Sequence, residues 1–388
     1  MQLAVSLALV AAGGLFVRAS VKAASADIGF PLAHQLVVNL DPTVAGYKET
    51  ETRGLYMRVL DRMRALAGVE DLALASTVPF GGMSEGRSVF LPGQNEGRHP
   101  EFDIVTAGYF DPLHLPFLRG RAFSSADDLP SAATRSAVVD VRLARMLFGE
   151  ADPVGKSIEV PLHDTDKNRL AYTIVGVVPS VKHDILLSDR DERGHVYVPY
   201  GTLFRGRMSM HVRVAPTAGE AMMLSAVQRE LHQIDPRLPV LLARSMTSHR
   251  DASFGEWSVR TGATLFSTFG GLALLLATIG IYGLKAYDVS RRTREIGIRM
   301  ALGATGAQVL RLVLKEGLRT TAIALGVGLL LALGLGKLVS GLLYHVSPFD
   351  PAVLAIALVS LATATLVASY FPARYATRVV PLEALRSE

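Results

Sequence analysis

The stretch RRTREIGIRMALGATGAQVLRLVLKEGLR, residues 291–319, places seven Arg or Lys residues and two Glu residues between two long apolar runs. Residues 261–284 carry no charge, and residues 320–344 carry only Lys337. Each run is long enough to cross the roughly 30 Å hydrocarbon core of a bilayer as a helix. Because short loops rich in Lys and Arg stay in the cytoplasm, the pattern predicts a cytoplasmic loop over residues 288–318.

Two more apolar runs complete the membrane pattern. Residues 351–373 are uncharged, and residues 1–17 form an apolar run that ends at Arg18. The first run is short for a span, and a secretory signal is the alternative interpretation, although the basic residues that open such a signal are missing. We favour a membrane helix. The expected transmembrane helices cover residues 1–22 and about 261–286, 319–344 and 351–373.

The charge distribution sets the expected orientation. Residues 1–22 have 2 basic and no acidic residues, a net charge of +2. Residues 23–260 have 26 basic and 29 acidic residues, a net charge of −3. Residues 261–388 have 12 basic and 6 acidic residues, a net charge of +6. The positive surplus therefore lies mainly beside membrane helices, which argues against nucleic-acid binding. With the loop in the cytoplasm, alternation puts residues 23–258 outside the cell inner (plasma) membrane. Arg18 and Lys22 then lie on the external side, although the rule places basic residues beside membrane helices in the cytoplasm.

The middle region alternates between helix and strand patterns. Leu55, Val59, Met63 and Leu66 share one face of a helix that is expected to stop at Gly68. β-branched runs predict strands at residues 136–141, 172–178, 194–200 and 210–216. We therefore expect an α-helical membrane protein with four transmembrane helices and a large extracytoplasmic α/β (α+β) domain between helices 1 and 2.

Helix-capping patterns define the ends of several expected helices. Thr217 and Glu220 have the spacing of a capping box in the middle region. In the basic loop, Gly303 suits the left-handed position that ends a helix, and Thr305 with Gln308 has capping-box spacing for the next helix. The loop is therefore expected to be a helix, a turn and a second helix that continues into the membrane.

The first loop helix has two distinct sides. Ile296, Met300 and Gly303 lie near one side, and Arg292, Glu295 and Arg299 lie on an adjacent one. Such a helix can lie in the membrane interface or insert into a groove of another protein. The alternative is that the arginines only set the topology and contact anionic lipids.

Several segments resemble FtsX-like and MacB-like ABC transporter permeases, and together they cover nearly the whole chain. Residues 291–314 are similar to the cytoplasmic loop between the second and third of four membrane helices in that family. Residues 2–20 are similar to the family's first helix. The family's periplasmic core domain resembles residues 109–123, 152–158, 172–178 and 196–200.

The resemblance implies that the loop docks onto an ATPase subunit. The implied coupling residues are Arg292, Arg294, Glu295, Ile296, Gly297, Ile298, Arg299, Met300, Ala301, Leu302, Gly303 and Ala304. It further implies a MacB-like core domain over residues 23–258 and an FtsX-like permease domain over residues 259–388.

The implied function is that of a permease subunit of an ABC transporter. The subunit is not itself an enzyme. It couples ATP hydrolysis by a partner to motion of the external domain, for export or efflux. No cofactor is expected, since ATP is bound by the partner. Further implied partners are a second permease copy or half, membrane lipid, and an envelope adaptor or outer-membrane factor. The alternative is an FtsX-type regulator that activates a cell-wall hydrolase.

The sequence also departs from the family pattern. MacB itself carries an ATPase domain on the same chain, whereas this sequence resembles the second half of larger permeases with two such halves. Lys285 stands where an apolar residue is expected.

Two short patterns suggest catalysis or nucleotide binding but lack the required context. Ser84 has the Gly-x-Ser-x-Gly spacing of a hydrolase nucleophile, yet a strand and loop follow it rather than a helix. Gly149 and Gly155 are separated by five residues where a phosphate-binding loop has four, and a strand is expected after Lys156. We therefore expect neither a catalytic serine nor nucleotide binding.

One polar segment collects possible metal ligands. The segment holds His183, Asp184, Asp189, Asp191 and His195. Their spacing matches no common metal-binding motif, and a polar run between two strands is typical of a solvated loop. No metal site is expected.

Glycines recur in the apolar runs and suggest close helix packing, with lipid-facing positions as the alternative. They are Gly270, Gly280, Gly283, Gly326, Gly328, Gly334 and Gly336.

Overall fold

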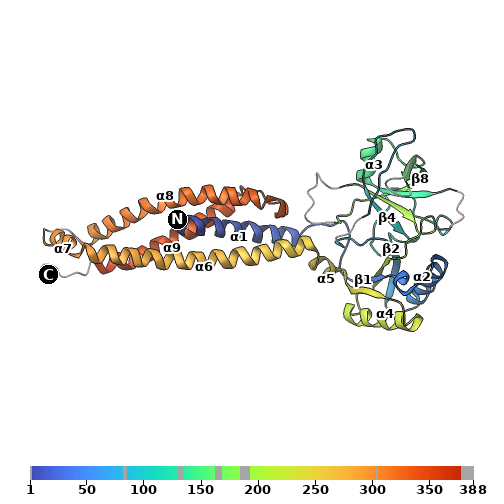
Figure 1. Ribbon diagram of the computed structural model, residues 1–388, viewed down its shortest axis with the longest axis horizontal. Helices are drawn as coiled ribbons and strands as arrows, with labels where there is room; N and C mark the ends of the chain where they lie inside the picture. Colours follow the sequence, from blue (N-terminus) through green and yellow to red (C-terminus); the bar gives the residue numbers. More distant parts are fainter. Residues whose placement is uncertain are drawn as a thin grey trace. The chain divides into compact units, whose positions relative to one another are not determined.

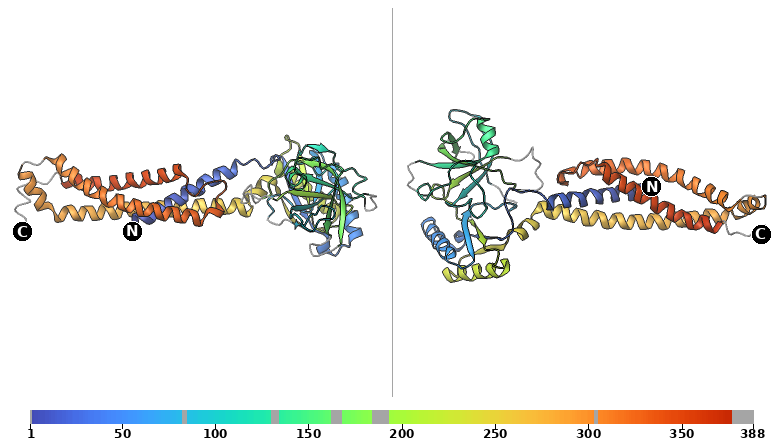
Figure 2. Two further views of the ribbon diagram at one scale, coloured as in Figure 1. Left: turned by 90° about the horizontal axis from the view of Figure 1, so that it is seen from above. Right: turned by 180° about the vertical axis from the view of Figure 1, so that it is seen from behind.

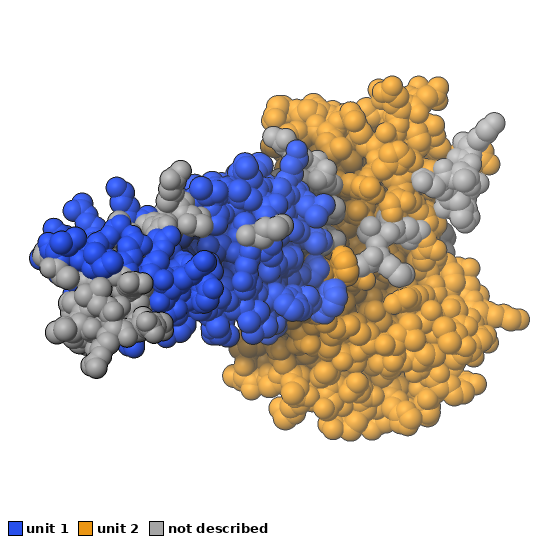
Figure 3. Space-filling model, turned by 60° about the vertical axis from the view of Figure 1, so that its left-hand side comes forward, with its two compact units in different colours: residues 1–25, 257–388 blue, residues 26–256 orange. Residues whose placement is uncertain are grey.

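The computed structural model describes residues 2–81, 85–129, 134–161, 168–183, 193–302 and 305–376. The chain forms two compact units, which Figure 3 colours separately. One unit joins residues 1–25 to residues 257–388, and the other comprises residues 26–256.

The first unit is a bundle of long helices (Figures 1 and 2). Its helices are α1 (Gln2–Ala24), α6 (Phe254–Arg291), α7 (Thr293–Ala301), α8 (Gly306–Leu338), the 3₁₀ helix η2 (Ser340–Leu342) and α9 (Pro351–Ala376). Within the described ranges, four of them are long and apolar enough to cross a membrane, namely α1, α6, the Thr321–Leu338 part of α8, and α9. The prediction of four membrane helices, the first at the N-terminus, is confirmed.

Helix α1 is an integral part of this bundle. It packs along α8 and α9, and Leu7, Leu15 and Phe16 are each 1% exposed. The Phe16 ring stacks on Phe266 of α6 with centroids 5.2 Å apart. A helix held by three others through buried side chains is a structural element of the bundle, which supports the membrane helix over the secretory signal.

Some of the glycines in the bundle allow close helix packing and others do not. A Cβ at Gly328 of α8 would lie 2.9 Å from the Cα of Ala4, and a Cβ at Gly270 of α6 would lie 3.2 Å from Val10 backbone atoms. At Gly336 it would meet the Pro348 carbonyl at 2.9 Å. By contrast, Gly283, Gly326 and Gly334 have no described atom within 4 Å of that position. The packing prediction therefore holds at the positions that face α1 or the segment before α9.

The third membrane helix ends earlier than expected. Helix α8 stops at Leu338 and η2 follows, whereas the apolar run predicted helix to about residue 344. The residues after Leu338 stay apolar because Leu343 and Tyr344 are buried in the connection to α9. Hydrophobicity alone does not distinguish such a buried connection from a helix.

The second unit is built on one mixed β-sheet. Its helices are η1 (Pro42–Ala45), α2 (Glu49–Arg64), α3 (Val141–Phe148), α4 (Glu220–Ile234) and α5 (Met246–Asp251). Its strands are β1 (Gln35–Leu40), β2 (Val69–Ala75), β3 (Glu85–Gly86), β4 (Glu101–Val105), β5 (Arg119–Gly120), β6 (Ser136–Asp140), β7 (Ser157–Pro161), β8 (Arg169–Val178), β9 (His195–Pro199), β10 (Met208–Val214) and β11 (Val240–Ser245).

The described strands pair in the order β11-β1-β10-β2-β4-β9-β6-β8-β5, with β3 beside β4 and β7 beside β8. The pairs β4–β9 and β6–β8 are parallel, and the other pairs are antiparallel. The four predicted strands correspond to β6, β8, β9 and β10, and β7 follows Lys156 as expected. The mixed α/β domain predicted between the first and second membrane helices is confirmed.

Helices α2 and α4 cover one face of the β11-β1-β10-β2 half of the sheet (Figure 1). Leu55, Val59 and Met63 of α2 are fully buried in the same core as Leu36 and Val38 of β1. Period-2 alternation along β1 and period-3.6 alternation along α2 bring these apolar faces together. This is the helical face that the sequence predicted.

Two predicted helix ends are wrong. Helix α2 ends at Arg64 with Ala65 as its C-cap, because residues 65–68 form the turn into β2 and Gly68 adopts φ +94°. Helix α4 has Gly219 as its N-cap rather than Thr217. The Glu220 carboxylate accepts a hydrogen bond from the His34 backbone N–H at 2.8 Å, a long-range partner that the local spacing could not reveal.

The opposite face of this half-sheet is polar. Asn39 of β1 and Ser209, His211 and Arg213 of β10 alternate with the core residues and point away from α2 and α4. Residues near Pro112 cover part of this face, since Arg213 Nε donates to the Pro112 carbonyl at 2.8 Å. The sheet therefore separates an apolar core from a layer of buried polar side chains.

Candidate functional site

Helix α7 lies in the connection between α6 and α8 and holds most of the predicted coupling residues. The turn from α6 forms at Arg292, whose backbone N–H donates to the Asp288 and Val289 carbonyls at 3.1 and 3.2 Å. The Ile296 N–H then donates to the Arg292 carbonyl at 2.9 Å, which starts the new helix. The reversal of the chain thus takes place within a few residues.

The inner side of α7 is anchored by apolar packing. Ile296 and Val289 of α6 are each 6% exposed and contact one another, and Met300 packs against them. This is the side on which the sequence placed Ile296 and Met300. Burial of these side chains holds α7 against the end of α6.

The outer side of α7 combines charge with exposed apolar surface. Arg299 Nη2 lies 2.6 Å from Glu295 Oε1, an ion pair between side chains one turn apart. Ile298 is 43% exposed and Leu302 is 83% exposed. These four residues, which we call the α7 outer face, lie on one side of the helix at i, i+3, i+4 and i+7 spacing. Ile298 and Leu302 thus expose apolar surface on the same side of the helix as the Glu295–Arg299 ion pair.

The remaining predicted coupling residues lie outside the α7 outer face. Arg292 forms the turn, and Arg294, Gly297 and Ala301 belong to α7 by their backbone. Gly303 and Ala304 lie outside the described residues, and so does the prediction that Gly303 ends the helix.

Helix α8 begins with the predicted cap. The Thr305 N–H donates to Gln308 Oε1 at 3.0 Å, which is one of the two hydrogen bonds of a capping box. The helix then runs without interruption from Gly306 to Leu338, 33 residues or roughly 50 Å. It therefore connects the loop to the far end of the bundle as one element.

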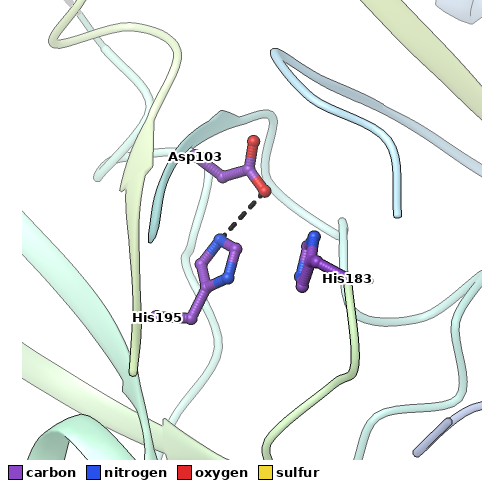
Figure 4. Close-up of side chains that lie close together, drawn as sticks. All are labelled: Asp103, His183 and His195. Atoms are coloured by element: carbon purple, nitrogen blue, oxygen red, sulfur yellow. Dashed lines mark hydrogen bonds and ion pairs between the residues drawn. The ribbon is translucent and has the colours of Figure 1, made fainter. Parts of the chain in front are cut away.

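A second cluster of chemically versatile side chains lies in the sheet domain (Figure 4). Asp103 of β4, His195 of β9 and His183, which follows β8, place one potential ligand atom each within 4.8 Å of one another. His195 Nε2 lies 3.0 Å from Asp103 Oδ2, and the His183 and His195 rings lie 4.4 Å apart. Burial, together with the neighbouring His195, lowers the pKa of His183 to about 3. This imidazole is therefore neutral near pH 7.

Sequence reasoning found His183 and His195 but missed Asp103. Asp103 lies 92 residues before His195, and the parallel pairing of β4 with β9 brings them together. Asp184, Asp189 and Asp191, the other members of the polar run, lie outside the described residues. The signal that was overlooked is an acidic residue in the buried strand EFDIV, where an isolated carboxylate is costly.

A cavity of about 510 Å³ lies on the polar side of the half-sheet. Arg205, Arg207, Arg244 and His249 line it together with Ser76 and Thr77, and its described lining has no Asp or Glu. Burial lowers the pKa of His249 to about 4, with a further contribution from nearby Arg244. The lining favours anionic over cationic ligands.

Of the two short patterns, the one around Gly149 and Gly155 lies in a helix end and a turn before a strand. Gly149 is the C-cap of α3, Gly155 has φ +82°, and β7 starts at Ser157. The Lys156 ammonium lies 4.7 Å from the centre of the Phe148 ring. Gly82 and Ser84 fall outside the described residues.

Two family models match this chain. Residues 3–230 match the MacB-like periplasmic core domain, and residues 267–381 match the FtsX-like permease C-terminal domain. Since the first model alone covers more than half of the chain, the chain belongs to the MacB-like, FtsX-type family of ABC transporter permeases. It is a multi-pass membrane protein with four candidate spans.

The curated relatives are longer proteins. The macrolide export ATP-binding/permease protein MacB of Sodalis glossinidius is 27% identical over 338 residues, which cover 84% of this chain and 50% of that protein. The pyoverdine export ATP-binding/permease protein PvdT of Pseudomonas aeruginosa is 29% identical over 297 residues, which cover 71% and 40%. The chain thus spans about half of the length of these relatives or less.

One solved structure shows a low overall similarity to this chain. The periplasmic region of MacB from Actinobacillus actinomycetemcomitans aligns with a TM-score of 0.40 at 13% identity and covers 58% of this chain and 95% of that one.

Proposed function

We propose that this chain is a permease subunit that couples ATP hydrolysis by a separate ABC ATPase to motion of its sheet domain, and that this motion drives export. The names of the relatives, which join ATP binding to a permease for macrolide or pyoverdine export, support the pairing with an ATPase and the direction of transport. In this proposal α7 lies on the cytoplasmic side of the cell inner membrane, and the sheet domain lies on the opposite side.

The observation that carries the proposal is the outer face of α7. Ile298 and Leu302 expose apolar surface beside the Glu295–Arg299 pair, while Ile296 and Met300 anchor the helix from behind. A helix that is anchored on one side and exposes both apolar and charged side chains on the other can bind in a groove of a partner protein. The ATPase would receive this face, with the charged pair at the rim of the contact.

Helix α8 supplies the mechanical connection. A hydrogen-bonded helix of 33 residues moves as a rigid element, so a displacement at its capped start appears at Leu338. Closure of two ATPase subunits on ATP would thus shift the helix bundles of two paired permease units. The second unit is either another copy of this chain or a separate permease half. An envelope adaptor or an outer-membrane factor would receive the exported compound.

The first test measures ATPase stimulation in lipid nanodiscs, using the ABC ATPase that co-purifies with the wild-type chain. Leu302→Asp should remove most of the stimulation, because it places a charge in an apolar contact. Met57→Asp is the matched control, since Met57 is an exposed apolar residue of α2 in the sheet domain. Equal stimulation by wild type and Leu302→Asp would refute the docking role.

A charge swap separates docking from helix stability. Glu295→Arg and Arg299→Glu each replace an attractive pair by like charges one turn apart, which weakens α7 by about 0.4–1 kcal/mol. The double variant restores an ion pair within the helix but reverses its direction toward a partner. Loss of stimulation in the double variant supports a contact with the ATPase, whereas full recovery would show that the pair only stabilises α7.

Labelling tests the proposed sidedness. The chain has no cysteine, so single-cysteine variants need no prior substitution. In sealed cells a membrane-impermeant maleimide should label Glu96→Cys of the sheet domain and should label Arg299→Cys only after permeabilisation. The opposite pattern would reverse the proposed orientation.

Co-purification tests the export function separately. Recovery of an envelope adaptor or outer-membrane factor with the chain would support export. Recovery of a peptidoglycan hydrolase instead would show that the chain regulates cell-wall cleavage.

A further inference from the structure

The Asp103–His183–His195 cluster joins β4 to the segment after β8 and to β9, both of which lie far from β4 in sequence. Asp103 and His195 lie on adjacent parallel strands, with His195 paired to Glu101 in the register and Asp103 paired to Tyr197. His183 is brought to them by its backbone, since the Phe80 N–H donates to the His183 carbonyl at 2.9 Å. Strand pairing thus holds Asp103 and His195 together, and the backbone hydrogen bond to Phe80 fixes His183. Figure 4 shows the three side chains.

The Asp103 carboxylate is oriented by its neighbours. Its Oδ1 atom accepts hydrogen bonds from Ser76 Oγ at 3.1 Å, from the Thr77 N–H at 3.0 Å and from Thr77 Oγ1 at 2.5 Å. These donors occupy Oδ1 and leave Oδ2 directed at His195. Hydrogen bonds from surrounding groups position metal-ligating carboxylates in the same manner.

The two imidazoles are also positioned. The His195 ring stacks on Tyr197 with centroids 4.3 Å apart, and the His195 backbone N–H donates to Asp140 Oδ1 at 2.9 Å. His183 Nε2 is buried and has no hydrogen-bond partner among the described residues. A buried ring nitrogen without a partner is costly unless it meets a donor or a cation.

The Asp103 carboxylate lies in the interior of the sheet domain. Asp103 is fully buried, and the only ion pair that the described residues form with it is to His195, which is itself 4% exposed at its side chain. A buried carboxylate requires a compensating positive charge. A cation bound to Asp103 Oδ2 would add such a charge to the cluster.

We propose that Asp103 Oδ2, His183 Nε2 and His195 Nε2 bind one divalent transition metal of the zinc class. Two imidazoles and one carboxylate suit zinc, whereas magnesium and calcium prefer oxygen ligands alone. Ligand atoms about 2.0–2.2 Å from a tetrahedral metal lie about 3.3 Å from one another. The Asp103–His195 pair is already near that separation, and His183 has to approach it through a small side-chain movement.

The site has three protein ligands and a fourth position open to water or to a further ligand. A metal there would tie the segment after β8 to the β4–β9 pair. The inference does not depend on ATPase coupling, because all three ligands belong to the sheet domain.

Zinc binding to the full chain in detergent tests the proposal. The protein is purified through a tag without histidine, stripped with a chelator, and titrated with Zn²⁺ against a fluorescent zinc indicator. We expect one Zn²⁺ per chain, and Co²⁺ in its place should give the visible absorption of a tetrahedral complex. Absence of stoichiometric binding to the folded protein would overturn the proposal.

Variants assign the site. Asp103→Asn, His183→Gln and His195→Gln should each weaken Zn²⁺ binding tenfold or more, whereas His99→Gln and His232→Gln should not. Circular dichroism of the metal-free proteins checks folding. If Asp103→Asn or His195→Gln unfolds the domain, His183→Gln decides the matter, because His183 lies outside the strands. Unchanged affinity in a folded His183→Gln protein would refute the assignment.

Discussion

Arg18 of α1 and Asp350, the residue before α9, form an ion pair with 2.5 Å between Arg18 Nη1 and Asp350 Oδ1. The same Asp350 oxygen accepts hydrogen bonds from the Ala352 and Val353 N–H groups at 3.1 and 3.2 Å and so caps α9, with Pro351 at the first helical position. One carboxylate thus caps one membrane helix and neutralises the arginine of another. This pairing gives a local reason for Arg18 at a position where the topology rule disfavours it.

The double role of Asp350 predicts unequal effects of substitution. Arg18→Gln should lower the free energy of unfolding by about 0.5–1 kcal/mol, because Arg18 is partly exposed. Asp350→Ala should cost about 1–3 kcal/mol, since it removes the helix cap as well. Asp350→Asn, which keeps acceptors for the cap, should resemble Arg18→Gln. Thermal unfolding in one detergent measures all three, and equal effects of Arg18→Gln and Asp350→Ala would contradict the dual role.

Close packing of α1 on α8 predicts that Gly328 tolerates no side chain. Gly328→Val should destabilise the bundle by about 1–3 kcal/mol, because the new atoms would overlap Ala4 and Leu7. Gly334→Val is the matched control on the same helix, where no described atom lies near the Cβ position. Melting temperatures in detergent should fall for the first variant alone. A similar loss for both would point to helix propensity rather than packing.

The Asp127 carboxylate is predicted to stabilise the sheet domain. It accepts hydrogen bonds from Arg121, from the backbone and hydroxyl of Ser124, and from Ser136 Oγ at 2.5 Å. The Arg121 hydrogen bond and those from the two serines outweigh burial and hold the pKa of Asp127 well below its usual range. Asp127→Asn should cost about 2–3 kcal/mol, since it weakens charge-assisted hydrogen bonds. Asp61→Asn at an exposed α2 position should be nearly neutral in the same unfolding assay.

Because the His249 imidazole is buried, we predict that the sheet domain loses stability in mild acid. Its pKa is about 4 in the folded chain, chiefly because of burial, against an ordinary value of 6.5. The unfolded chain therefore takes up the proton first. The stabilisation is complete above about pH 6.5 and falls between pH 6.5 and 4, by at most about 1.4 kcal/mol per pH unit.

The measurement compares melting of the sheet domain at pH 7.5 and pH 5.0. His249→Met, which cannot titrate, should lose less stability on acidification than the wild type, whereas His232→Gln at an exposed position should behave like the wild type. An unchanged pH response in His249→Met would show that His249 is not the group responsible.

The membrane helices and the main strands could be predicted from the sequence because their signals are local. An uncharged run of about 20 residues favours a span wherever it lies, and β-branched alternation predicts a strand without knowledge of its neighbours. The same locality explains why Leu55, Val59 and Met63 were assigned to one buried face. It also explains the errors, since the apolar run after Leu338 is buried without being helical and Glu220 contacts His34 rather than a local cap.

The sequence by itself determined the number of membrane helices, the insertion of an α/β domain between the first two, and the polarity of α7, because each depends on hydrophobicity and charge over short distances. Only the tertiary structure decided which face of α7 remains exposed, that Arg18 meets Asp350, and that Asp103 joins His183 and His195. The Arg18–Asp350 and Asp103–His195 contacts link residues far apart in the chain, and strand order and helix packing, which no local pattern encodes, bring them together.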